Sequence, residues 1–262
     1  MIDLKNSRSY SIQDRNNIQN SILNSITTLN KIFKNSIEKE VEFSAGDEIQ
    51  GLFISLQSAY LYYRFFSMLI FPIQTHTGIG FGTWDIRVES ASSTAQDGTV
   101  YHYARNAIDE AKKSLEYSVL FYSKNKNDII INSLINAATL LASKQSEYQN
   151  KLMLLAEILY PIASEDIVDY KNLKELLKSI QFEKKENLTL DIDYPVISTQ
   201  LEKESFYITE GKKRGLSTQI SKLLGVSRQS VEKAIKTGNI YELRNLTITV
   251  LKAMESIQGE NL

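Results

Sequence analysis

Residues 41–54 read Val-Glu-Phe-Ser-Ala-Gly-Asp-Glu-Ile-Gln-Gly-Leu-Phe-Ile. Val41 and Phe43 alternate with polar residues, and a short apolar run from Ile49 to Ile54 follows the turn residues Gly46-Asp47-Glu48. This pattern is typical of a β-hairpin, and its tip carries two carboxylates. The fold class therefore includes a sheet.

Helical periodicity surrounds this hairpin. Apolar residues recur at spacings of three and four over 12–37, and a second apolar helix over 56–71 ends at Pro72. A strand with alternate glycines follows at 78–82, and a third helix is expected over 100–118. We therefore expect an α+β fold in which helices cover one face of an antiparallel or mixed sheet.

Composition excludes several classes of protein. The 262 residues contain no cysteine, so disulfides, thiolate nucleophiles and Cys-based metal sites are excluded. The longest apolar run, 61–73, contains Arg64 and is too short to span a membrane, and no signal peptide is recognisable. We expect a cytoplasmic protein without a membrane partner.

The overall net charge of −1 is a sum of opposites. Residues 161–210 hold 11 Asp and Glu against 6 Lys and Arg, a net charge of −5, with a possible strand at 188–192. Residues 211–262 hold 9 Lys and Arg against 4 Glu, a net charge of +5. We expect separate roles for these two segments. The predicted organisation is a palm domain (1–127), a helical connector (128–160), an acidic insert (161–210) and a helix-turn-helix domain (211–262).

The hairpin tip has a possible chemical use. Two carboxylates held in a small volume repel each other unless a divalent cation is present, and magnesium or manganese would serve. The alternative is a solvated turn, because Gly and Asp are common turn residues. The hairpin alone leaves both interpretations open.

Several motifs, in the same order, resemble the SatD family over about residues 1–160, and the resemblance returns in the C-terminal segment. These motifs are Asp3-Leu4-Lys5-Asn6-Ser7-Arg8, Asp14-Arg15 with Gln19, Gly46-Asp47-Glu48-Ile49-Gln50-Gly51-Leu52, Gly78-Ile79-Gly80-Phe81-Gly82, and Asp97-Gly98 with Tyr103-Ala104-Arg105. That family is in turn similar to class III nucleotide cyclases and GGDEF proteins, which share a ferredoxin-like palm.

The resemblance implies roles for four residues. Asp3 and Asp47 match the two metal-binding aspartates of the cyclases, and Glu48 matches the acidic residue of the GGDEF-type hairpin. Arg105 matches the arginine that stabilises the triphosphate in the transition state. A nucleotide, held with magnesium or manganese, is the implied ligand.

The sequence also departs from the cyclase pattern. Tyr101 stands where the cyclases have asparagine, and His76 stands where they have arginine. Only two residues precede Asp3, so we expect almost none of the central strand and a frayed position for this carboxylate. These departures favour a palm that binds a ligand without converting it over one that catalyses a reaction of the ligand.

Residues 216–235 have the pattern of a helix-turn-helix. Gly225 supplies the turn, Ser227 is the expected N-cap, and Val226 and Val231 are expected to anchor the second helix. Ser227, Arg228, Gln229, Ser230 and Lys233 of that helix are predicted to bind nucleic acid. Arg228 and Gln229 are the residues expected to read DNA bases. Phosphate contacts are predicted from Lys212, Lys213, Arg214, Lys222 and Lys236. The alternative is a helical pair used for dimerisation or protein docking.

Three functions remain open. The first is a DNA-binding regulator whose palm senses a nucleotide or a partner. The second is a metal-dependent nucleotidyl cyclase or nucleotidyltransferase, and the third is a non-catalytic dimeric scaffold. A single helix-turn-helix usually binds DNA as a dimer, so a homodimer is expected, and the last helix, over 240–257, could form its seam.

Overall fold

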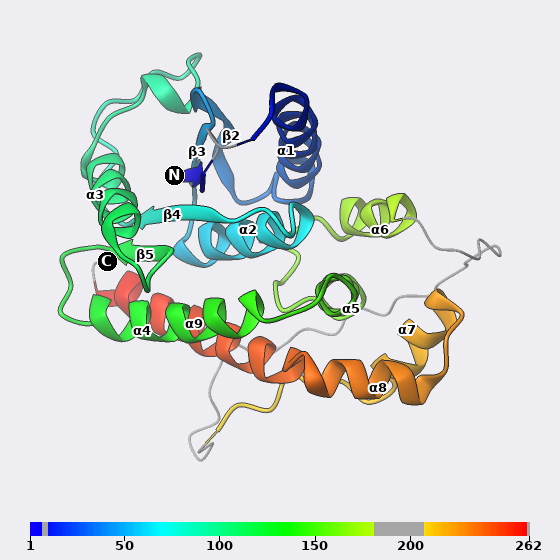
Figure 1. Ribbon diagram of the computed structural model, residues 1–262. Coiled ribbons are helices and arrows are strands. Elements are labelled where there is room, and N and C mark those ends of the chain that lie inside the picture. Colours follow the sequence, from blue (N-terminus) through cyan, green and yellow to red (C-terminus); the bar gives the residue numbers. More distant parts are fainter. Residues whose placement is uncertain (7–9, 181–206, 261–262) are drawn as a thin grey trace.

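The computed structural model describes residues 1–6, 10–180 and 207–260 (Figure 1). Its strands are β1 (Ile2–Leu4), β2 (Ile37–Ala45), β3 (Glu48–Phe53), β4 (Thr75–Gly80) and β5 (Val119–Tyr122). Its α-helices are α1 (Ile12–Ile32), α2 (Leu56–Leu69), α3 (Thr99–Lys113), α4 (Asp128–Ser143), α5 (Glu147–Leu159), α6 (Tyr170–Ser179), α7 (Leu216–Leu224), α8 (Arg228–Thr237) and α9 (Ile240–Glu260), and η2 (Ser93–Ala95) is a 3-10 turn.

The five strands form one mixed sheet in the order β2-β3-β1-β4-β5. All neighbours are antiparallel except β4 and β5, which are parallel and are joined by the crossover helix α3. This architecture confirms the expected α+β class. The β2–β3 hairpin is also confirmed, and Gly46 adopts a φ of 64° in its two-residue turn, a conformation that favours glycine.

Strand β1 corrects one expectation. It has only three residues, but it is central, since it pairs with β3 through Ile2 and with β4 along its whole length. Ile2 and Leu4 are buried on one face, and the Lys5 amide extends the pairing by donating to the Gln74 carbonyl oxygen. Asp3 is therefore held from both sides, and the expectation that it is frayed was wrong.

Helices lie on both faces of the sheet, whereas one covered face was expected. Ile2, Ile49 and Ile79 belong to the core that contains α1 and α2. On the other face α3 lies directly on β4: a Cβ at Gly78 would lie 2.2 Å from the Ala104 carbonyl oxygen, and one at Gly80 would lie 2.4 Å from the Ala104 nitrogen. Figure 1 shows α3 and α1 on opposite sides of the strands. The alternate glycines allow this close approach.

The aromatic residues of α2 form the centre of the core. Tyr60, Tyr62, Phe65 and Phe66 are all buried, and the ring of Phe33 lies 5.3 Å from that of Tyr62 and 5.9 Å from that of Phe65. Core packing therefore explains the dense aromatic pattern of this helix.

The C-terminal helices pack on the rest of the chain. Helix α9 runs beside α4 and also contacts α2, while α7 and α8 contact α5 (Figure 1). Three charged side chains are buried at this junction: Glu157 of α5 lies between Arg64 of α2 and Arg244 of α9, at 3.0 Å and 2.8 Å. Arg244 also donates to the carbonyl oxygens of Gly211 and Tyr160.

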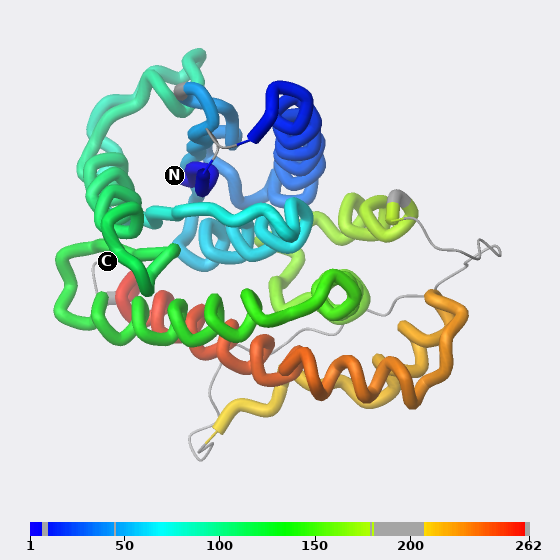
Figure 2. Tube along the Cα trace, in the orientation of Figure 1, coloured from blue at the N-terminus to red at the C-terminus, as the bar shows by residue number. Residues whose placement is uncertain are grey.

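Several element boundaries differ from the sequence-based expectation. Helix α1 ends at Ile32 rather than 37, because residues 33–36 form turns that lead into β2. Helix α3 ends at Lys113 rather than 118, and strand β5, which was not expected, follows it. Residues 170–179 of the expected acidic insert form α6, which lies beside α1 (Figure 2). The possible strand at 188–192 lies outside the described residues.

None of the helices in the described part of the chain is both long and apolar enough to cross a membrane.

Candidate functional site

A row of three titratable side chains crosses the centre of the sheet. Asp3 on β1 pairs in register with His76 on β4, and the pairing of Ile2 with Ile49 places Asp3 opposite Glu48 on β3. Side chains at paired positions share a face, so all three lie on the face that α3 covers. Two carboxylates directly opposite each other would repel, and the row therefore requires cations.

Helix α3 supplies two cations to this row. Arg105 binds Glu48 with both terminal nitrogens, at 2.6 Å and 2.5 Å. Lys112 lies two helical turns further along, with its Nζ 2.8 Å from Oδ2 of Asp3 and 3.9 Å from Oε2 of Glu48. Two carboxylates thus face two cations, and the bidentate geometry is the one that guanidinium favours for carboxylate or phosphate.

These contacts keep Glu48 ionised. Burial alone would raise its pKa, but the hydrogen bonds and charge of Arg105, with help from Ser44 and Lys112, lower it below the ordinary value of 4.5. The hydrogen bonds with Glu48 likewise raise the pKa of Arg105. Burial, together with Lys5, lowers the pKa of His76, although Asp3 opposes the shift, so this side chain is neutral at pH 7.

The expected metal-binding residues are not gathered in one place. Asp3 and Glu48 face each other, whereas Asp47 lies in the turn at the hairpin tip. Within the described residues, no group of three or more His, Asp and Glu side chains is placed to hold a metal ion. Oxygen ligands from Asp3 and Glu48 are present, but both are paired with cations in this arrangement.

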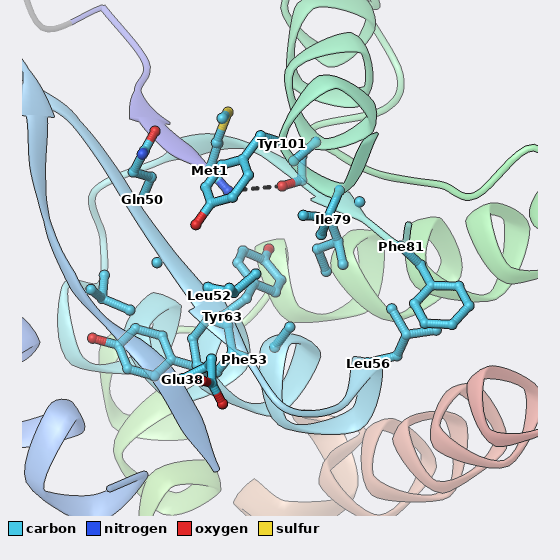
Figure 3. A pocket seen from close by; sticks show the side chains of 18 of the residues that line it. Met1, Glu38, Gln50, Leu52, Phe53, Leu56, Tyr63, Ile79, Phe81 and Tyr101 are labelled. Carbon is cyan, nitrogen blue, oxygen red and sulfur yellow. Dashed lines mark hydrogen bonds between the residues drawn. The ribbon is translucent and has the colours of Figure 1, made fainter. Parts of the chain in front are cut away.

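A cavity of about 370 Å³ lies next to the row, and it is lined by the neighbouring residues Ile2, Ile49 and Ala104 rather than by the charged side chains of the row. It lies in line with β1, between Gln50–Phe53 of β3 and Thr77–Gly80 of β4, and Tyr101 of α3 extends over it (Figure 3). The Met1 amino group lies at its edge and donates to the Gly78 carbonyl oxygen at 2.9 Å. Burial lowers the pKa of this amino group to about 5.

Tyr101 and Gln50 are polar residues among the apolar walls of the cavity. The Tyr101 hydroxyl is buried beside Ser93, and Gln50 donates to the hydroxyl of Ser93. Apolar walls with a few polar groups are typical of a small-molecule site.

The second group of predicted residues lies on α7 and α8. Gly225 ends α7 with a φ of 64°, and the Ser227 hydroxyl accepts a hydrogen bond from the Ser230 amide, as an N-cap does. Both features were predicted. Val231 and Ile235 are buried against the neighbouring helices, but Val226, expected as an anchor, is 40% exposed in the turn.

The outer face of α8 is open to solvent. Ser227, Arg228, Gln229, Ser230 and Lys233 are all exposed. Of the residues expected to contact phosphate, Lys212, Arg214, Lys222 and Lys236 are exposed, and Lys213 is half-buried over the ring of Tyr160. Arg228 pairs with Glu232 one turn away at 2.7 Å, which holds it along the helix.

Sequence reasoning missed Lys112, which pairs with the carboxylates of the row. A signal existed: Lys112 follows Arg105 by seven residues, so both lie on one face of the helix. That signal becomes specific only when the helix is known to cross the sheet at the carboxylates.

The fold and the site together define an α+β protein in which a crossover helix neutralises a row of carboxylates at the centre of a mixed sheet. The chain belongs to the SatD family, whose model matches residues 1–190. The match includes the sheet and the carboxylate row and ends before α7. Comparisons with curated proteins and with solved structures found no match.

Proposed function

We propose that the protein is a cytoplasmic DNA-binding regulator in which α7 and α8 form a helix-turn-helix and α8 is the recognition helix. The observation that carries the proposal is the outer face of α8, where Arg228 and Gln229 stand exposed in the first turn. Arginine and glutamine make bidentate hydrogen bonds to guanine and adenine in the major groove. The net charge of +5 over 211–262 provides the electrostatic attraction that DNA binding needs.

The sensing part of the proposal is a ferredoxin-like palm formed by β1–β4 with α1 and α2. The antiparallel order β2-β3-β1-β4, with both helices on one face, supports it. The ligand is a nucleotide or a partner that occupies the cavity beside Asp3 and Glu48, with Arg105 and Lys112 available to phosphate once they leave the carboxylates.

The test is DNA binding by the full chain. Selection from random-sequence duplexes is expected to enrich one sequence, and Arg228→Ala and Gln229→Ala are each expected to weaken binding to it by about 1–3 kcal/mol and to relax base preference. Lys126→Ala removes an exposed lysine of the α3–α4 region and should leave binding unchanged. If no sequence is enriched, or if both variants keep wild-type specificity, α8 is not a recognition helix.

The proposed DNA-binding form is a homodimer, because helix-turn-helix proteins commonly bind two half-sites with one chain on each. Sedimentation of the selected duplex with the protein should give two chains per duplex. One chain per duplex would contradict the dimer. The binding of the Arg228→Ala and Gln229→Ala variants would then decide whether α8 is the recognition helix.

The second candidate is a metal-dependent nucleotidyl cyclase or nucleotidyltransferase. The observation that favours it is the placement of Asp3 and Glu48 on neighbouring strands beside two cations. In this proposal Asp3 and Glu48 would supply oxygen ligands to magnesium or manganese, and Arg105 would bind the triphosphate, whereas Asp47 lies apart in the hairpin turn. Incubation with the four nucleoside triphosphates and manganese should give a cyclic or oligomeric product that Asp3→Asn abolishes. Absence of product excludes the enzyme while leaving the DNA-binding proposal intact. The dimeric scaffold remains the interpretation if both tests fail.

A further inference from the structure

A second cavity, of about 400 Å³, lies away from the carboxylate row. It is bordered by α2, α4, α5 and the loop that joins α2 to β4, and Leu243 of α9 contributes to its wall. Tyr63, Met68 and Met153 give it an apolar surface, while Asn136 and Gln74 add amide groups. Its size and mixed lining are those of a small-molecule site.

Arg64 lines this cavity and has only one partner for its charge among the described side chains. The residue is only 9% exposed, and its Nη2 donates to Oε1 of Glu157 at 3.0 Å. Its Nη1 is buried and has no hydrogen-bond partner among the described residues. A buried charge with unsatisfied donors is costly, so a ligand that brings a negative charge to this guanidinium is favoured.

The charges around Arg64 do not balance. Glu157 is the shared partner of Arg64 and Arg244, and each of its oxygens is already taken by one arginine. The group therefore holds one surplus positive charge in the core, where unpaired charge is strongly disfavoured. The other charged residues that line the cavity, Lys5 and Glu116, have opposite signs. One negative charge would complete the balance.

We propose that this cavity binds a small organic monocarboxylate. Its carboxylate pairs with the guanidinium of Arg64, and its apolar part packs against Tyr63, Met68 and Met153. A monoanion matches the single surplus charge, and the apolar wall favours an organic body over inorganic phosphate. The inference is independent of the DNA-binding proposal, since no residue of α8 takes part.

The test uses a panel of carboxylates and their neutral amides as probes. Acetate, hexanoate and benzoate are added to the full chain at constant ionic strength, beside acetamide, hexanamide and benzamide, and the midpoint of thermal unfolding is measured. At least one carboxylate is expected to raise the midpoint in a saturable manner, while its amide does not. Arg64→Met should weaken binding at least about tenfold, because a charge-assisted hydrogen bond is lost. Arg87→Met removes an exposed arginine that does not line this cavity and should keep the wild-type response.

A second variant keeps the test decisive if Arg64→Met fails to fold. Ser67→Leu fills the cavity from α2 while leaving Arg64 and its pairing with Glu157 in place, and it should also lose the response. The inference is overturned if no carboxylate raises the midpoint, if amide and acid act alike, or if Ser67→Leu responds as the wild type does.

Discussion

Glu48 remains charged inside the sheet because Arg105 binds both of its oxygens. Its pKa in the folded chain lies below the ordinary 4.5, so the ion pair stabilises the fold above that pH. The contribution is lost as the pH falls below about 4.5 through the folded-state pKa, because the folded state must then take up a proton that the unfolded state already holds. We expect Glu48→Gln to lower the free energy of unfolding at pH 7 by about 1–3 kcal/mol, and by much less at pH 3. Urea unfolding at both pH values measures this.

Glu110→Gln is the matched control, since Glu110 pairs with Lys113 at 2.7 Å on the exposed side of the same helix. Its effect should not exceed about 0.5 kcal/mol at either pH. An equal loss in the two variants would mean that the ion pair of Glu48 with Arg105 is no stronger than a surface pair.

Of this row and the cations that face it, the sequence predicts Asp3, Glu48 and Arg105 as site residues through a resemblance. It does not predict that Lys112 joins them, since that depends on the position of α3 over the sheet, or that Asp47 stands apart in the turn of the hairpin.

At the scale of secondary-structure elements, the contact between β4 and α3 depends on glycine. A Cβ at Gly78 would lie 2.2 Å from the Ala104 carbonyl oxygen and 2.4 Å from the Ile108 nitrogen. These are backbone atoms, so no side chain can rotate away and the helix must move. We expect Gly78→Ala to lower the free energy of unfolding by about 2–3 kcal/mol, at the upper end of overpacking effects. Chemical denaturation measures the loss.

Gly259→Ala provides the comparison, because nothing lies within 4 Å of the added carbon and the residue is in α9. This variant should be neutral or more stable by up to about 1 kcal/mol. Comparable destabilisation by both alanines would show that helix packing on β4 is not the cause.

The glycine pattern predicted close approach by a helix or a ligand, and the structure shows a helix. Strand β5 escaped prediction because a run of four residues, Val119–Tyr122, carries too little periodicity, and its parallel partner β4 is distant in the sequence.

At the scale of the whole molecule, the hydrophobic core is continuous from the sheet to the C-terminal helices. The sequence indicates that residues 211–262 differ in charge from the rest, but it cannot show where they pack. The junction is formed by Arg64, Glu157 and Arg244, which are far apart in the chain and look like ordinary surface residues in a sequence. Buried charges of this kind are recognisable only when their partners are known.

The charge balance of this junction predicts an order of stabilities. Glu157→Gln leaves two buried arginines without a counter-charge, whereas Arg64→Met leaves Glu157 and Arg244 as a balanced pair. We therefore expect Glu157→Gln to cost about 3–5 kcal/mol of unfolding free energy and Arg64→Met distinctly less. Guanidinium unfolding followed by Trp84 fluorescence and by helical circular dichroism measures both variants, and the two signals should change together because one core joins the two regions. If Arg64→Met proves as costly as Glu157→Gln, the packing of the arginine stem and not the balance of charge holds α2, α5 and α9 together.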